Sequence, residues 1–300
     1  MTPSPELVAR FARDFGSLVG TLPERVGIAV SGGPDSVALL LLAHAAFPER
    51  VEAATVDHSL RPESRDEALY VGEVCAGLPC PHAILPVTVP GGPAGLQAEA
   101  RSARYDALRH WAAERGIGAV ATAHHADDQA ETVLMRLRRG SGVAGLAGIR
   151  AVRVEDSLAV VRPLLSWTKA ELIEIVEQAG IEPLDDPSNR DTRFDRTQAR
   201  ALLATTRWLE PFPLARSAAA LAEAEEALTW STDRLWRERA ARAGDALMLD
   251  PAGLPPELKR RLVLRALREF GPSAPRGEEI MRLLDRLQRG AAATLAGVKF

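Results

Sequence analysis

The chain has 300 residues, of which 46% are apolar and 26% charged, a balance that is ordinary for a folded protein and excludes extensive disorder. Its formal net charge of -3 gives no overall attraction for a polyanion, so a nucleic-acid function has to depend on local basic patches. There is no run of eighteen apolar residues and no signal-peptide pattern, and the two cysteines, Cys75 and Cys80, fit neither a disulfide framework nor a paired zinc site. We therefore predict a cytoplasmic protein with no membrane segment.

Short apolar, β-branched segments alternate with longer helical patterns over roughly the first half of the chain. Strands are expected at residues 26–30, 51–57, 83–89, 119–123 and 159–161. Helices are expected between them, at residues 36–47, 63–76, 96–115 and 127–138, and after the last strand at residues 168–179. Strands that alternate with helices of this length form a parallel sheet that is covered on both faces. The sequence therefore predicts a doubly wound α/β domain with a mostly parallel, five-stranded sheet.

A different pattern begins near Pro213. Residues 214–243, 256–270 and 278–289 are rich in Ala, Leu, Arg and Glu at helical spacing. Pro211 and Pro213 mark a border, because proline disfavours helix in the residue before it. We predict a catalytic domain over residues 1–212 and a smaller helical domain over residues 213–300. Residues 257–289 hold nine basic against five acidic side chains, which either contact nucleic acid or form solvated helix faces.

A glycine-rich loop, Ser31-Gly32-Gly33-Pro34-Asp35-Ser36, follows the first expected strand and begins the next helix. Such a loop can offer backbone N–H groups, serine hydroxyls and a positive helix end to an anion, and glycine allows the backbone to approach phosphate oxygens. Asp35 cannot attract phosphate, so we expect it to hold Mg²⁺ or a cationic substrate. The loop matches neither the Walker nor the dinucleotide-binding motif. The alternative is a turn with a purely structural role.

Residues 122–132 (TAHHADDQAET) form a second constellation, which runs from a strand end into a helix. Asp127, Asp128 and Glu131 project from the first helical turns, next to His124 and His125. Such a group suits Mg²⁺, an ammonium group or proton transfer near neutral pH. Acidic residues also favour a helix N-terminus without any function. A catalytic zinc site needs a more definite ligand set than this stretch supplies.

The strand, loop and helix together resemble the PP-loop family of ATP pyrophosphatases, whose members cleave ATP between the α and β phosphates to adenylate an oxygen. Residues 122–132 resemble the corresponding motif of the tRNA(Ile)-lysidine synthetases within that family. Other stretches agree with these enzymes in the same order: residues 56–61 (VDHSLR), 100–105 (ARSARY), 139–142 (RGSG) with 145–146 (GL), 162–165 (RPLL) and 186–189 (DPSN). The family usually has an Arg-Asn pair leading to another Arg after the last stretch, where this chain has residues 196–200 (RTQAR). Residues 294–300 are similar to the start of a further family element, so we expect a short form or a truncated chain.

The resemblance implies a ligase that acts on an isoleucine tRNA with a CAU anticodon. It would adenylate the C2 oxygen of the wobble cytidine with ATP and then attach free L-lysine to form lysidine. AMP and pyrophosphate would be released, and codon specificity would change from AUG to AUA. ATP and Mg²⁺ are the implied cofactors, tRNA(Ile) and free L-lysine are the implied partners, and a homodimer is left open.

The resemblance also implies roles for individual residues. The ATP-binding residues would be Ser31, Gly32, Gly33, Pro34, Asp35, Ser36, Val56 and Asp57. The catalytic residues would be Asp35, Arg104, His124, Asp128 and Glu131. Of these, Asp35, Asp128 and Glu131 would bind Mg²⁺ or the lysine ammonium group, with Asp35 and Asp128 as the Mg²⁺ ligands. His124 would orient groups or transfer a proton, and Arg104 would stabilise charge on phosphate or AMP. The tRNA-binding residues would be Arg139, Asn189, Arg196 and Arg200.

Two other functions compete with this interpretation. A related enzyme that thiolates a tRNA base would share the loop, but it generally needs a catalytic cysteine or a C-x-x-C pair, which Cys75 and Cys80 do not form. A non-catalytic RNA- or nucleotide-binding module could keep the fold alone. The intact loop at residues 31–36 and the string at residues 124–131 favour an enzyme over such a module.

Overall fold

The computed structural model describes residues 2–58, 64–88, 96–155, 158–184, 195–271, 275 and 277–300. The chain divides into two compact units, Met1–Ala222 and Glu223–Phe300. Helix α9 (Pro211–Arg239) begins in the first unit and ends in the second. The predicted domain border at residue 212 falls near the beginning of this helix, and it stays a prediction.

The first unit is built around a six-stranded sheet with the strand order β3-β2-β1-β4-β6-β5. The strands are β1 (Val26–Ala29), β2 (Val51–Asp57), β3 (His82–Pro86), β4 (Ala119–Ala121), β5 (Val152–Glu155) and β6 (Leu158–Val161). All neighbours pair in parallel except β5, which runs antiparallel to β6 at the edge. The doubly wound, mostly parallel sheet is thus confirmed, but the predicted number of five strands is wrong. The sixth strand, β5, escapes sequence analysis because Val152 and Val154 face outward and alternate with charged residues.

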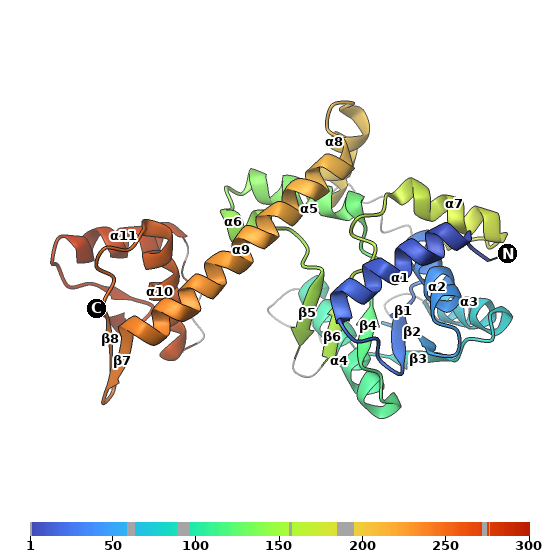
Figure 1. Cartoon of the computed structure of the whole chain (residues 1–300), viewed down its shortest axis with the longest axis horizontal. Helices are drawn as coiled ribbons and strands as arrows, with labels where there is room; N and C mark the ends of the chain where they lie inside the picture. The colour runs from blue at the N-terminus through green and yellow to red at the C-terminus, as the bar shows by residue number, and fades with distance from the viewer. Residues whose placement is uncertain are drawn as a thin grey trace. The chain divides into compact units, whose positions relative to one another are not determined.

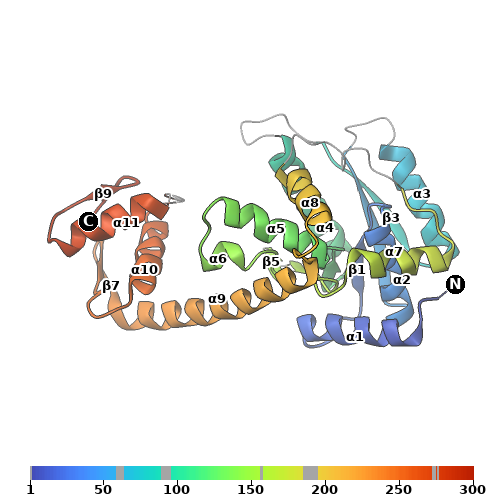
Figure 2. The ribbon, with the colours of Figure 1, turned by 90° about the horizontal axis from the view of Figure 1, so that it is seen from above.

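Helices surround this sheet (Figures 1 and 2). They are α1 (Pro5–Val19), α2 (Pro34–Ala46), α3 (Ser64–Gly77), α4 (Leu96–Arg115), α5 (Ala126–Arg138), α6 (Val143–Leu146), α7 (Lys169–Ala179) and α8 (Asp195–Thr205). Of these helices, α1, α6 and α8 are not predicted from the sequence. Yet α1 has clear local signals: Ser4 caps it by accepting a hydrogen bond from the Leu7 N–H, and Pro5 occupies its first turn.

Two apolar clusters show that the sheet is covered on both faces. Neighbouring residues of one strand belong to different clusters, as Val120 and Ala121 of β4 do, because successive side chains of a strand point to opposite faces. One cluster joins α1, α2, α3 and α7 to the sheet, and the other joins α4 to it. Helix α2 contacts both α1 and α7, and its residues from Ser36 to Ala43 are all buried, which explains its lack of a polar face.

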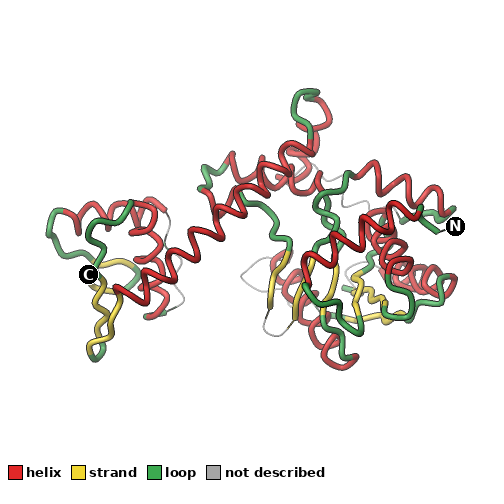
Figure 3. Tube along the Cα trace, viewed as in Figure 1, coloured by secondary structure: helices red, strands yellow, loops and turns green. Residues whose placement is uncertain are grey.

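The second unit has its own small core. It contains α10 (Pro256–Glu269), α11 (Gly277–Gln288) and two hairpins, formed by β7 (Ala240–Ala243) with β8 (Ala246–Leu249) and by β9 (Thr294–Leu295) with β10 (Val298–Lys299) (Figure 3). The core includes Val263 and Leu267 from α10 and Ile280, Leu283 and Leu284 from α11. The region is helical as predicted, with the two hairpins added. Across the described residues, no helix combines the length and the apolar character that a bilayer span requires.

Candidate active site

The topology of the sheet brings the two predicted constellations together. Strand order reverses between β1 and β4, which lie side by side and parallel with Val26 opposite Ala119. In open α/β sheets this switch point leaves a crevice at the carboxyl ends of the strands. The loop at residues 31–36 follows β1, and residues 122–131 follow β4. Direct contact confirms that they meet, since His125 Nε2 lies 3.4 Å from Asp35 Oδ2.

The loop at residues 31–36 is closed on itself by the Ser36 hydroxyl. This hydroxyl donates to the Gly33 carbonyl at 2.9 Å, accepts from the Ser31 N–H at 3.1 Å and lies 3.3 Å from the Ser31 hydroxyl. Gly33 precedes α2 without a side-chain cap, and Pro34 occupies the first helical turn. The positive end of α2 is therefore directed at this loop, as anion binding requires.

Gly32 has a reason to be glycine that the sequence does not reveal. Its φ angle is +88°, where other residues are strained, and a Cβ atom there would lie 2.4 Å from Leu184 Cδ1. The Gly32 carbonyl also accepts a hydrogen bond from the Leu184 N–H at 2.9 Å. Thus Gly32 permits packing within the protein, whereas a Cβ at Gly33 would meet no atom closer than 3.9 Å.

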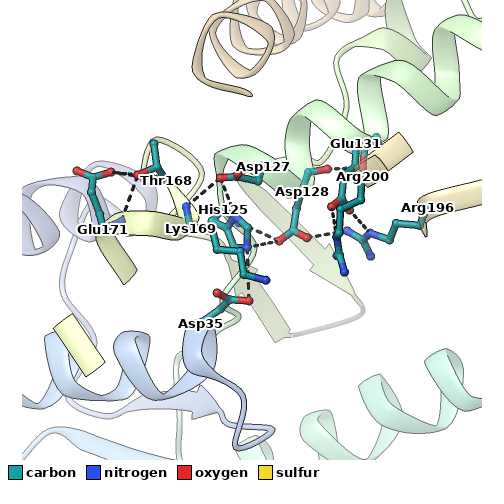
Figure 4. Close-up of polar contacts among 11 residues, drawn as sticks. Asp35, His125, Asp127, Asp128, Glu131, Thr168, Lys169, Glu171, Arg196 and Arg200 are labelled. Atoms are coloured by element: carbon teal, nitrogen blue, oxygen red, sulfur yellow. Dashed lines mark hydrogen bonds and ion pairs between the residues drawn. The ribbon is translucent and has the colours of Figure 1, made fainter. Parts of the chain in front are cut away.

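His125 is the buried centre of the site (Figure 4), and the predicted site residues omit it. Its ring nitrogens lie 3.4 Å from Asp35, 3.4 Å from Asp127 and 3.5 Å from Asp128. Burial by itself lowers the pKa of His125, but the carboxylates of Asp127, Asp35 and Asp128 outweigh burial and raise the pKa to about 10. His125 is therefore a protonated counter-ion near neutral pH.

Two of these carboxylates also fix helix ends. Asp128 Oδ2 accepts the His125 N–H at 3.1 Å and so caps α5, while Asp127 Oδ2 accepts the Lys169 N–H at 2.9 Å at the start of α7. Burial raises the pKa of Asp127, but His125 and the Lys169 N–H together hold the pKa below its usual range. Asp127 therefore joins α5 to α7 and orients the histidine.

Glu131 is 2% exposed and pairs with two arginines from α8. Its carboxylate accepts from Arg196 Nε and from Arg200 Nε, each at 2.8 Å, and Arg196 Nη2 also donates to Asp128 Oδ1 at 2.9 Å. Figure 4 shows both guanidinium groups directed at these carboxylates. The two arginines, predicted to contact tRNA, thus lie against predicted catalytic residues. Another cation could bind these carboxylates only by displacing the arginines.

The other predicted tRNA contacts are less informative. Arg139 pairs with Asp195 at 2.5 Å, and Arg138 reaches the same carboxylate at 3.0 Å. Asn189 lies outside the described residues. Their role in tRNA binding stays a prediction.

His124 follows β4 and accepts or donates a hydrogen bond at Nδ1, 3.0 Å from the Thr122 hydroxyl. Burial lowers the pKa of His124 to about 4, with Asp128 opposing the change and Arg162, Arg196 and Arg101 reinforcing it. His124 is therefore neutral at physiological pH. Adjacent histidines thus carry opposite protonation states, which no sequence pattern distinguishes.

The remaining predicted residues lie at or beside the end of β2, which is the other neighbour of β1. Asp57 is buried and accepts a hydrogen bond from the Ser64 hydroxyl at 2.9 Å. Val56 is half-buried and packs against the α4 cluster. Arg104 on α4 places its guanidinium 3.4 Å from His58 Nε2. They frame the site at the β2 strand end.

Asp35 and Asp128 suit the predicted Mg²⁺ ion in chemistry. The Asp35 Oδ1 atom is buried and has no hydrogen-bond partner, so a cation could satisfy it. Protein sites usually hold Mg²⁺ through one or two carboxylates together with substrate phosphates. Within the described ranges, no three His, Cys, Asp or Glu side chains are arranged to hold a metal without such help.

Comparison with known proteins agrees with this geometry. A family model described as a PP-loop domain matches residues 7–206. A tRNA(Ile)-lysidine synthase from Zymomonas mobilis is 46% identical over 289 residues, which cover 94% of this chain and 87% of that protein. The synthase of the same name from Novosphingobium aromaticivorans is 45% identical over 294 residues, which cover 97% and 89%.

A solved structure, the U34-tRNA thiolase NcsA from Methanococcus maripaludis, shares the fold. It aligns with a TM-score of 0.58 at 16% identity over 72% of this chain and 80% of that one. The fold match, the family model and the sequence identity to the synthases agree with one another and with the resemblance found in the sequence. The chain belongs to the tRNA(Ile)-lysidine synthases of the PP-loop family.

Proposed function

We propose that this chain converts the wobble cytidine of a tRNA(Ile) with a CAU anticodon to lysidine, using ATP and free L-lysine. The observation that carries the proposal is the contact of the loop at residues 31–36 with residues 122–131 at the switch point of the sheet, where His125 lies between Asp35 and Asp128. The names of the relatives supply the substrate. One site thereby combines a pyrophosphate-binding loop with carboxylates that can hold an amine.

The chemistry has two steps. The cytosine C2 oxygen attacks the α-phosphorus of ATP, an O–P bond forms, and the bond to the bridging oxygen breaks to release pyrophosphate. The deprotonated ε-amine of lysine then attacks C2, a C–N bond forms, and the C2–O bond breaks to release AMP. Adenylation is needed because the C2 oxygen of cytosine is otherwise a poor leaving group.

The residues of the site divide this work between them. The loop at residues 31–36 and the positive end of α2 hold the pyrophosphate. Bound Mg²⁺, held by Asp35 and Asp128, would neutralise phosphate charge. Arg104 stabilises negative charge on AMP from the β2 side. Neutral His124 offers an uncharged ring that can accept a hydrogen bond or a proton from the amine.

Glu131 is the binding group for the lysine ammonium, because Asp128 is assigned to Mg²⁺. The guanidinium groups of Arg196 and Arg200 already pair with Glu131, and a carboxylate that pairs with two cations suits an ammonium group. An incoming ammonium would displace at least part of these pairs. Lysine binding is thereby coupled to the position of α8.

The basic side chains of residues 257–289, in the second unit, give only weak support for tRNA binding. Arg260, Arg261 and Arg265 are paired with acidic side chains within the same unit. Solvated, internally paired helix faces therefore account for part of the basic excess. We retain tRNA contact by this unit, a homodimer and a cytoplasmic location as expectations.

The decisive experiment supplies purified protein with ATP, Mg²⁺, labelled lysine and tRNA(Ile) that carries a CAU anticodon. We expect the label to enter the anticodon cytidine, with one AMP released for each lysine, in mass analysis of the nucleosides. The Asp35→Ala variant should lose this transfer. Turnover that requires a sulfur donor instead of lysine would contradict the proposal and favour a thiolase.

A further inference from the structure

Arg162 is a buried cation that the reaction described above does not use. It directly follows β6 and is 3% exposed. Its Nη1 donates to the Arg150 carbonyl at 2.7 Å and its Nη2 to the Tyr105 hydroxyl at 3.5 Å, while Nε is buried with no partner. In the part of the chain that the structure describes, no carboxylate lies within ion-pair distance of it. A buried charge without a counter-ion is costly, so a bound anion would compensate it.

The hydroxyl of Tyr105 links this buried cation to an exposed one. Arg101, one turn earlier on α4, donates Nη2 to the same hydroxyl at 3.4 Å, and its guanidinium carbon lies 5.0 Å from the centre of the Tyr105 ring. Tyr105 is itself 8% exposed. Because the hydroxyl accepts from both arginines, its own proton is available for donation to an anion. Arg162 thus anchors Tyr105, and Tyr105 anchors Arg101.

This group lies beside the active site. Strand β6 pairs with β4, and the Thr122 N–H donates to the Val161 carbonyl at 3.0 Å, so Arg162 follows β6 next to the segment that carries His124. The electrostatic surroundings of His124 agree, because Asp128 and its partner Arg196 act on it from one group and Arg162 and Arg101 act on it from another. A cationic group and an acidic group therefore flank one histidine.

We propose that Arg162, Tyr105 and Arg101 form a subsite for the α-carboxylate of the amino-acid substrate. This inference depends on the proposed function, because it assigns the anionic end of the same lysine whose ammonium end is assigned to Glu131. The loop at residues 31–36 already serves the phosphates of ATP, and Arg104 is assigned to the charge on AMP. Arg196 and Arg200 already pair with Asp128 and Glu131, so Arg162 and Arg101 are the cations beside the site that have no assigned role. Guanidinium groups suit a carboxylate because the two can form parallel hydrogen bonds. The subsite would distinguish an amino acid from a simple amine.

L-Lysinamide is the probe that isolates this carboxylate, because it keeps both amines and lacks the negative charge. With the full-length enzyme, ATP and tRNA, we would measure the KM for lysine, the KM for ATP and the inhibition constant of L-lysinamide against lysine transfer. Tyr105→Phe and Arg101→Gln should raise the KM for lysine on the order of tenfold to a hundredfold. The KM for ATP and the constant for L-lysinamide should stay within about twofold of those of the wild type.

Controls separate this subsite from general damage and from the proposed function. Arg109→Gln, on the same helix and paired with Asp106 at 2.9 Å, should leave all three constants unchanged. Arg162→Lys keeps the charge and should be milder than Arg162→Met. The subsite is refuted if the KM for lysine and the inhibition constant of L-lysinamide rise in parallel. It is also refuted if the KM for ATP rises instead, because that result would mark a phosphate site. A different result would refute the proposed function itself, namely that the wild-type enzyme transfers no lysine at all.

Discussion

At the scale of single residues, position in the fold decides what a glycine or a histidine does. Gly32 and Gly33 are neighbours of the same type in one loop, yet only Gly32 has a left-handed backbone and a side chain packed against it. His124 and His125 are also neighbours, and the charges around them separate their pKa values to about 4 and about 10. Chemical identity therefore sets what these residues can do, and surroundings select among the options.

Replacement of Gly32 tests this view directly. Gly32→Ala should lower the free energy of unfolding by about 2 kcal/mol, because alanine is strained at a φ of +88° and its Cβ would displace Leu184. The matched Gly33→Ala variant has an ordinary φ of -70° and open space, so its stability should change by less than about 0.5 kcal/mol. Denaturant unfolding of both variants measures the difference. Equal losses would contradict the assignment of Gly32 to internal packing.

At the scale of elements, helix ends carry both structure and site. Helix α7 begins with a reciprocal cap, in which Glu171 Oε2 accepts the Thr168 N–H at 2.7 Å and the Thr168 hydroxyl accepts the Glu171 N–H at 3.3 Å. Asp127 accepts the next N–H, from Lys169. The start of α7 thus fixes an aspartate that contacts His125, so the cap supports the orientation of the site.

The cap of α7 should make stability depend on pH. Partial burial raises the pKa of Glu171, but the Thr168 N–H and Arg10 together lower it by more than burial raises it. The pKa of Glu171 therefore lies below the ordinary 4.5. A lowered pKa stabilises the fold above pH 4.5, and this contribution disappears as the pH falls through the folded value. Glu171→Gln should therefore cost about 1 kcal/mol at pH 7 and progressively less below pH 4.5. Unfolding curves across this range would contradict the idea if the difference stayed constant.

Helix α8 should be held to α5 through Glu131. Glu131→Gln removes the charge that pairs with Arg196 and Arg200, and because both arginines are partly exposed we expect a loss of only about 1–2 kcal/mol. Amide hydrogen exchange should become faster in α8. Asp195→Asn breaks the exposed pairs with Arg138 and Arg139 and serves as the control, with no measurable change. Equal acceleration in both variants would show that Glu131 has no special role.

At the scale of the whole molecule, two separate cores predict two unfolding events. The core of Glu223–Phe300 contains Leu283, which is 3% exposed, and shares no member with the clusters around the sheet. Leu283→Ala should destabilise this unit by about 3 kcal/mol. Calorimetry should show one transition shifted and the other unchanged, with ATP binding intact. The exposed Met281→Ala variant is the control and should shift neither transition. If the whole protein instead unfolded in one transition that Leu283→Ala shifted, the two cores would not be independent.

The sequence by itself determined the doubly wound sheet, the loop at residues 31–36 and the family. These follow from local information, since strand and helix periods, glycine positions and motif spacing are all legible along the chain. The resemblance to the family also assigned Asp35 and Asp128 to one Mg²⁺ site.

Only the tertiary structure decided how these residues work. Arg196 pairs with Glu131 across 65 positions of sequence, and Tyr105 bonds to Arg162 across 57. Edge strand β5, the carboxylates around His125 and, among the described residues, the lack of an acidic partner at Arg162 likewise depend on which segments pack together. Burial and charge are properties of an assembled environment, so no local pattern predicts them.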